Sequence, residues 1–96
     1  MPDEYQIFQL FLLKENLKLT PQRKAVLDAV FATHQHFDAD EMVQILNGRG
    51  HRISRASVYR TLDLLVRSGL VHALELGDSK KQYEHVIGHR HHDHLV

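Results

Sequence analysis

Cysteine is absent from the 96-residue chain, which excludes disulfides, thiolate catalysis and zinc sites built from cysteine. Long apolar runs are missing as well, and no stretch approaches the roughly 20 residues that a membrane span needs. The chain opens with Met1-Pro2-Asp3-Glu4, without a basic segment ahead of an apolar one, so it shows no secretory signal. From these absences we expect a cytoplasmic protein with no membrane partner.

The composition is that of one ordinary globular domain. Apolar residues make up 43% and charged residues 25%, which separates the chain from disordered sequences. The 12 basic and 12 acidic residues cancel, so the net charge indicates no partner. The distribution is more informative, because five arginines lie between Arg49 and Arg67 against Asp63 alone. Such a basic segment can bind a polyanion although the chain is neutral overall.

Apolar spacing and capping residues predict four helices. The expected bounds are residues 4–16, Thr20-Pro21 to about Thr33, Asp38 to Asn47-Gly48, and Ser54 to Gly69. Thr20, Asp38 and Ser54 each place a side-chain oxygen where it accepts from free helix amides, and Glu41 completes a capping box with Asp38. We expect glycine to end the third and fourth helices, because it tolerates the left-handed conformation.

After Gly69 the apolar pattern becomes that of strands. Residues 70–76 and 81–86 are expected to be two strands, joined by the turn Gly77-Asp78-Ser79. Helices followed by a single hairpin predict a mainly α fold with a β wing. The fold class is therefore a winged helix-turn-helix, a helical core plus a C-terminal two-stranded β-hairpin. Its third and fourth helices, joined by residues 48–53, form the helix-turn-helix pair.

The fourth helix is the candidate DNA-reading element. With Val58, Leu62 and Leu65 toward the core, the rotation of about 100° per residue turns another set of side chains outward. The outward set is Ala56, Arg60, Asp63 and Arg67, flanked by Ser57 and Tyr59. Arg60 can offer two donors to a guanine edge, and Tyr59 can contact a thymine methyl or a phosphate. The alternative is a solvated face on which Asp63 forms surface ion pairs with Arg60 and Arg67.

Histidine is abundant, with nine residues in the chain and five among the last twelve. Near neutral pH such residues are titrating switches or metal ligands. In an extended tail, His92 and His94 share one face, while His91 and Asp93 share the other. Each pair can supply two ligands, and a tetrahedral site needs three or four. The alternative is a solvated tail with no ligand role.

Two residues outside the tail are candidates to complete the His92–His94 pair. His36 lies in the loop ahead of the third helix, and Glu84 lies on the second expected strand. Imidazole and carboxylate together suit zinc, ferrous iron, manganese or nickel. The other histidines are expected to be ordinary surface or packing residues: His51, His72, His85 and His89.

Four ordered segments resemble the N-terminal half of the ferric uptake regulator (Fur) family. They are Leu19-Thr20-Pro21-Gln22-Arg23, His36-Phe37-Asp38-Ala39-Asp40-Glu41, Ala56-Ser57-Val58-Tyr59-Arg60-Thr61-Leu62 and His91-His92-Asp93-His94-Leu95. The resemblance extends from about Leu17 to Val96. It implies a bacterial metal-responsive transcription regulator, usually a repressor, and not an enzyme. The expected partners are double-stranded DNA with an AT-rich palindromic operator and a second copy in a homodimer.

The resemblance also assigns roles to individual residues. The regulatory metal site would consist of His36, Glu84, His92 and His94, and half of a second site of His91 and Asp93. The DNA-binding residues would be Tyr59 and Arg60 with Ser57 on the reading helix, Lys18 in the minor groove, and Arg23 on the backbone. Fe²⁺ or Zn²⁺ is the expected cofactor, with Mn²⁺ and Ni²⁺ as alternatives.

The chain departs from the family at its end. Family members continue through cysteine pairs into a dimerisation domain, whereas this sequence stops at Val96. We therefore expect residues 1–87 to form the winged-helix DNA-binding domain. Residues 88–96 would be a His-rich hinge leading to a C-terminal dimerisation domain that this chain lacks.

Other functions compete with an iron- or zinc-responsive regulator. Peroxide-sensing members of the family resemble the chain too, but they usually carry aspartate where Glu84 stands. A metal-independent winged-helix module for protein interaction is a second alternative. A small zinc hydrolase is a third, and it lacks an evident acid–base residue beside the metal ligands.

Overall fold

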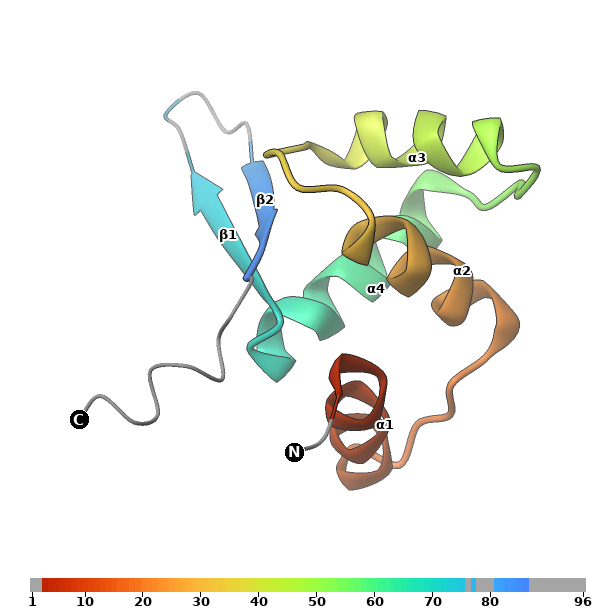
Figure 1. Cartoon of the computed structure of the whole chain (residues 1–96), viewed down its shortest axis with the longest axis vertical. Coiled ribbons are helices and arrows are strands. Elements are labelled where there is room, and N and C mark those ends of the chain that lie inside the picture. Colours follow the sequence, from red (N-terminus) through yellow and green to blue (C-terminus); the bar gives the residue numbers. More distant parts are fainter. Residues whose placement is uncertain (1–2, 76, 78–80, 87–96) are drawn as a thin grey trace.

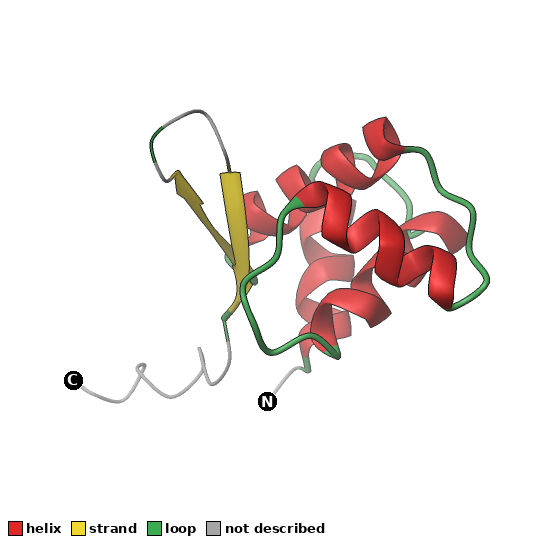
Figure 2. Cartoon of the chain, turned by 90° about the horizontal axis from the view of Figure 1, so that it is seen from above, coloured by secondary structure: helices red, strands yellow, loops and turns green. Residues whose placement is uncertain are grey.

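Four helices precede a two-stranded antiparallel hairpin along the chain (Figure 1). The structure is a computed structural model that describes residues 3–75, 77 and 81–86. Its elements are α1 (Glu4–Lys14), α2 (Pro21–Phe31), α3 (Ala39–Gly48), α4 (Arg55–Ser68), β1 (Val71–Glu75) and β2 (Lys81–His85). The hairpin lies to one side of the helices (Figure 2), so the predicted winged helix-turn-helix is confirmed.

The predicted helix starts are confirmed by their capping contacts. Thr20 Oγ1 accepts from the amide of Arg23 at 3.2 Å, and Ser54 Oγ accepts from the amide of Ser57 at 3.1 Å. Asp38 caps α3 through the predicted capping box with Glu41. Each side-chain oxygen satisfies an amide that has no partner inside its helix.

The helix ends differ from the predictions by a few residues. α1 ends at Lys14 and not at residue 16, because Asn16 leaves the helix with a φ of 60°. α2 ends at Phe31, ahead of the expected Thr33. Gly48 is still helical, and the left-handed residue after α3 is Gly50, with a φ of 88°. Gly69 ends α4 in the left-handed conformation, as predicted.

All four helices and the wing contribute to a single core. The largest buried side chains are Phe8 and Leu12 of α1, Leu27 of α2, Met42 and Leu46 of α3, Leu62 and Leu65 of α4, and Phe37, Leu70 and Tyr83 from the loops and the wing. Removing this apolar surface from water is the main force that stabilises the fold. None of the helices that the structure describes is long and apolar enough to cross a bilayer.

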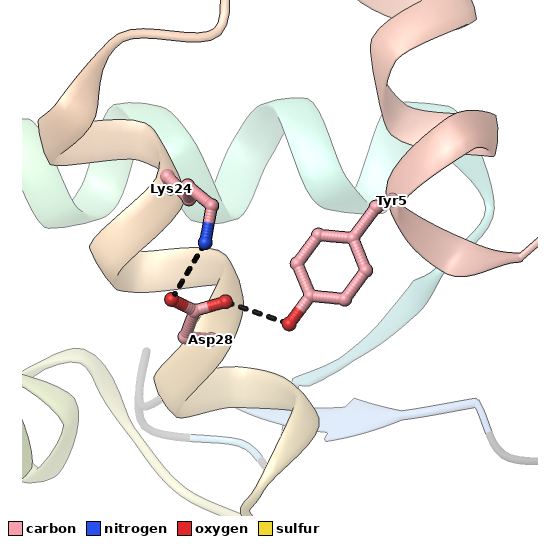
Figure 3. A network of polar contacts seen from close by, with 3 residues as sticks. All are labelled: Tyr5, Lys24 and Asp28. Atoms are coloured by element: carbon pink, nitrogen blue, oxygen red, sulfur yellow. Dashed lines mark hydrogen bonds and ion pairs between the residues drawn. The ribbon is translucent and has the colours of Figure 1, made fainter.

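A polar network joins α1 to α2 across the molecular surface (Figure 3). Tyr5 Oη donates to Asp28 Oδ1 at 2.6 Å, and Lys24 Nζ lies 3.3 Å from Asp28 Oδ2. The hydrogen bond to Asp28 raises the pKa of Tyr5 to about 12. α1 is therefore attached to α2 by a specific polar contact in addition to its apolar face.

The loop between α2 and α3 pairs with the wing, which the sequence did not predict. Phe37 and Tyr83 form an isolated antiparallel bridge in which each amide donates to the other residue's carbonyl, at 3.1 and 2.7 Å. Their rings stack with centroids 5.9 Å apart. The bridge adds the loop to the edge of β2, opposite β1, and fixes the position of the residues next to Phe37.

Candidate nucleic-acid interface and metal ligands

α4 has the buried and exposed faces that its spacing predicts. Val58, Leu62 and Leu65 are completely buried, whereas Arg60 is exposed and Tyr59 is 37% exposed despite its aromatic ring. The N-terminal half of α4 therefore offers an aromatic ring and a guanidinium to the solvent. This is the end of a reading helix that approaches base edges in helix-turn-helix proteins.

The surface ion pairs of Asp63 that were the alternative to DNA binding do not form among the described residues. Arg67 Nη2 instead lies 2.7 Å from Glu15 Oε1 of the segment after α1. Arg55 Nε lies 2.5 Å from Asp40 Oδ1 of α3. Arg60 has no carboxylate partner in the described part of the chain, and its Nη2 donates to Ser57 Oγ at 3.4 Å.

Two of the three arginines on α4 are thus neutralised by acids from other segments, and Arg60 is not. An unpaired guanidinium keeps its charge and most of its donors available for an external acceptor. The ion pairs of Asp63 with Arg60 and Arg67 that the alternative interpretation of α4 assumed are therefore wrong for the described residues. The arrangement leaves Arg60 as the guanidinium of this helix that is free to bind an anion or a base edge.

Sequence reasoning missed the environment of Tyr59. The guanidinium carbon of Arg55 lies 5.3 Å from the centroid of the Tyr59 ring. The hydrogen bond to Asp40 and its charge raise the pKa of Arg55. The spacing of four residues between Arg55 and Tyr59 was a signal, because such pairs are neighbours on a helix surface.

The segment before α2 lies against the same end of α4. Arg23 Nη1 donates to the backbone carbonyl of Lys18 at 2.6 Å, which orders the segment that carries the exposed Lys18 side chain. A hollow of about 190 Å³ separates the start of α2 from α4. Its lining residues are Thr20, Gln22, Arg23, Ser57, Arg60 and Thr61. Three of the residues singled out for DNA binding, Arg23, Ser57 and Arg60, therefore share one surface.

His36 and Glu84, far apart in the sequence, face each other in the structure. His36 Nε2 lies 3.4 Å from Glu84 Oε1, and the two side chains are 53% and 49% exposed. The bridge between Phe37 and Tyr83 produces this contact, because the next residues of an antiparallel bridge are His36 and Glu84. An imidazole and a carboxylate are thereby placed together at the surface, where a cation from solvent can reach them.

The remaining metal-ligand candidates lie outside the described residues. They are His91, His92, Asp93 and His94. Within residues 3–75, 77 and 81–86, no three histidine or acidic side chains are arranged to hold a metal ion. His36 and Glu84 alone are two ligands of types that divalent ions bind, and they are fewer than a complete site requires.

Comparison with known proteins adds independent information. The sequence profile of the ferric uptake regulator family matches residues 14–96. The ferric uptake regulation protein of Synechococcus elongatus is 36% identical over 81 residues, covering 82% of this chain and 55% of its own length. The peroxide operon regulator of Bacillus subtilis is 35% identical over 81 residues, covering 83% of this chain and 56% of its own length.

The fold comparison agrees with the sequence comparison. The crystal structure of the Vibrio cholerae ferric uptake regulator superimposes with a TM-score of 0.70 at 28% identity. The match covers 84% of this chain and 63% of that structure. This chain spans about half the length of the curated relatives that it matches.

Proposed function

Because the chain belongs to the ferric uptake regulator family, we propose that it is the DNA-binding part of a metal-responsive transcriptional repressor. The observation that carries the proposal is the exposed face of α4, where Tyr59 and the unpaired Arg60 stand beside Ser57. Proteins of this family are transcription regulators and not enzymes. We expect the protein to act in the cytoplasm, where its DNA lies.

DNA would bind along α4 and the segment before α2. Arg60 would donate two hydrogen bonds to a guanine, and Tyr59 would contact a thymine methyl or a phosphate. The small side chain of Ser57 would let the helix enter the major groove closely. Lys18 would contact the minor groove. Arg23 would lie near a phosphate of the DNA backbone, and its hydrogen bond to the Lys18 carbonyl would hold Lys18 in place.

The metal site would join three parts of the chain. His36 and Glu84 would be two ligands, with His92 and His94 from the tail as the others, and His91 with Asp93 would belong to a second site. The separation of 3.4 Å between His36 Nε2 and Glu84 Oε1 supports this assignment. In a tetrahedral zinc site with ligands about 2.1 Å from the metal, two ligand atoms would lie about 3.4 Å apart, which matches the separation of His36 Nε2 and Glu84 Oε1. When bound, a divalent ion would supply a cross-link between the wing, the loop before α3 and the tail.

The proposal extends to which divalent metal ion the regulator senses. Imidazole and carboxylate ligands suit Fe²⁺ and Zn²⁺, and they also suit Mn²⁺ and Ni²⁺. Glu84 favours an iron- or zinc-responsive regulator over a peroxide sensor. The identity of 35% with the peroxide operon regulator of Bacillus subtilis makes peroxide sensing the second candidate.

The proposed domain organisation follows the family. Residues 1–87 would be the winged-helix domain and residues 88–96 a hinge toward a dimerisation domain outside this sequence. In the dimer, two copies of α4 would read half-sites about 34 Å apart, one DNA turn, on an AT-rich palindromic operator. The metal would act by shifting the population toward this arrangement.

An electrophoretic shift experiment tests the proposal. The chain is titrated onto an AT-rich palindromic duplex and onto a shuffled duplex of equal composition, with and without Fe²⁺ or Zn²⁺, and with peroxide as a further arm. We expect tighter binding to the palindrome and a further gain with metal. Loss of binding with Fe²⁺ after peroxide treatment would support the peroxide-sensing candidate. Equal affinity for both duplexes in every arm would contradict sequence-specific DNA binding. An affinity for the palindrome that is the same with and without metal would contradict regulation by metal.

A further inference from the structure

Arg55, the first residue of α4, is held between two other side chains. Its Nε lies 2.5 Å from Asp40 Oδ1, and its guanidinium carbon lies 5.3 Å from the centre of the Tyr59 ring. Asp40 belongs to the first turn of α3, whereas Arg55 and Tyr59 lie one turn apart on α4. The three side chains therefore span both helices of the helix-turn-helix pair.

The charge of Arg55 already has a partner on the protein surface, where the Arg55 and Asp40 side chains are 60% and 66% exposed. Its guanidinium faces the Asp40 carboxylate, so the pair adds no net charge to the surface that would meet DNA. Arg60, five residues later, has no carboxylate partner among the described residues. The two arginines of the same helix half therefore differ: Arg55 is paired with a carboxylate of α3, and Arg60 is available to a ligand.

Tyr59 is the side chain that gains from this arrangement. A tyrosine that is 37% exposed would otherwise exchange between rotamers. A guanidinium over the ring face is attracted to the π electrons, and its planar shape restricts the ring to orientations that keep this contact. The contact with Asp40 favours this position of the guanidinium, although both side chains are exposed, and the start of α3 favours the negative charge of Asp40.

We propose that Asp40 and Arg55 form a clamp that fixes the ring of Tyr59, so that Arg55 is a positioning residue that sets base preference without binding phosphate. The inference rests on the proposed function, because it assigns a role to Arg55 in DNA reading by α4. Fixing the ring in the free protein removes an ordering cost that a mobile side chain would meet on binding. The clamp therefore favours sequences that accept the ring in one orientation.

Proton NMR of the chain without DNA tests the clamp by itself. A ring face shifts the side-chain protons of a group stacked on it upfield, so the Arg55 methylene protons should be shifted in the wild type. Asp40→Asn should reduce the shift, and Tyr59→Leu should abolish it. Arg55 protons at ordinary positions in the wild type would show that the clamp does not form.

DNA binding tests its role. A duplex selected from a random library by the wild-type chain is compared with its shuffled counterpart over a range of salt concentrations. Arg55→Gln should lower the ratio of the two affinities by roughly threefold to tenfold, the effect of one coupled contact. The salt slope, which is the slope of log affinity against log salt concentration, should stay unchanged. Asp40→Asn should lower the same ratio and steepen the slope by up to about 0.9, because the released Arg55 can then meet a phosphate.

Arg67→Gln is the matched control. Arg67 lies in the last turn of the same helix, pairs with Glu15 and lies over the Phe11 ring at 5.5 Å, so it also joins an acid and an aromatic ring, with Phe11 in place of Tyr59. Its replacement should leave the affinity ratio unchanged. If Arg55→Gln weakens both duplexes equally and lowers the salt slope, Arg55 is a phosphate contact and the proposal is wrong. If the wild-type chain shows the NMR shift but prefers no duplex, the clamp exists and the proposed function is wrong. The role of the clamp in DNA reading is then wrong as well.

Discussion

Glu4 Oε2 lies 2.5 Å from Nε2 of His85, which attaches the first turn of α1 to the last residue of β2. The His85 side chain is 5% exposed, and its ring stacks on Phe31 with centroids 4.8 Å apart. Its Nδ1 is buried without a hydrogen-bond partner among the described residues. The expectation that His85 is an ordinary packing residue is confirmed, and the structure adds a polar contact between α1 and the wing.

This contact should be visible in the stability of the fold. We expect His85→Ala to lower the free energy of unfolding by about 2–3 kcal/mol, because it leaves a cavity beside Phe31 and removes the partner of Glu4. Urea denaturation followed by circular dichroism measures the change. Glu15→Gln is the control, since its ion pair with Arg67 is exposed and should contribute less than about 1 kcal/mol. Equal losses in the two variants would show that the His85 contact is no stronger than a surface pair.

Alkaline pH should weaken the attachment of α1 to α2. The hydrogen bond to Asp28 raises the pKa of Tyr5 to about 12, above its ordinary value of 10.0. A raised folded-state pKa means that the contribution is complete below pH 10 and is lost as the pH rises toward 12. Burial raises the pKa of Tyr83 to about 12 as well, so two tyrosines contribute.

The urea concentration at the midpoint of unfolding should therefore decrease for the wild type as the pH is raised from 9 to about 11.5. The midpoint of Tyr5→Phe should decrease less over the same range. Deprotonation of lysines outside this network affects both proteins alike. Lys24 is the exception, because it pairs with Asp28 and lies 5.5 Å from the centre of the Tyr5 ring, so the comparison is repeated in a Lys24→Gln background. Parallel pH profiles for the wild type and Tyr5→Phe would contradict the role of the bond between Tyr5 and Asp28.

Arg60 should determine base preference. Arg60→Ala should weaken binding to a selected duplex by about 1–3 kcal/mol and narrow the difference from a shuffled duplex. The reason is that its guanidinium is the one on α4 without a carboxylate partner in the described chain. Fluorescence anisotropy measures both affinities, with Arg67→Ala as the control for loss of charge from α4. Superimposable curves for Arg60→Ala and the wild type would remove Arg60 from the interface.

Lys18 should act mainly through its charge. Lys18→Ala should weaken binding to all duplexes similarly and reduce the salt slope by roughly 0.9, the value of one phosphate contact. The side chain is exposed on a segment that Arg23 orders through the Lys18 carbonyl. Lys14→Ala, on the last turn of α1, is a control of equal charge. The assignment fails if the two lysine variants have the same slope.

His36 and Glu84 should both contribute to metal affinity. We expect His36→Ala and Glu84→Gln each to lower the affinity for Zn²⁺ by at least about tenfold, because a direct ligand should matter no less than the groups that support ligands. Isothermal titration calorimetry of the chain measures the change. His51→Ala replaces another exposed histidine, outside the proposed site, and should titrate like the wild type. A His36→Ala curve that matches the wild type would exclude His36 as a ligand.

Local chemistry made much of the fold predictable. Thr20, Asp38 and Ser54 begin their helices because the capping oxygen and the amide that it accepts from lie within three residues of each other. Gly69 ends α4 for an equally local reason, its positive φ. The buried and exposed faces of α4 follow from helical spacing, so the outward positions of Tyr59 and Arg60 could be predicted as well.

The sequence by itself thus determined the order of elements, most of their starts and the face of α4 that meets solvent. The family resemblance had assigned His36 and Glu84 to one site, and the structure added their contact at 3.4 Å. Only the tertiary structure decided the bridge of Phe37 with Tyr83 and the acids that neutralise two arginines of α4. The physical reason is range. Capping and periodicity depend on neighbours within about one helical turn, whereas these contacts depend on how distant segments pack and which rotamers the packed surface allows.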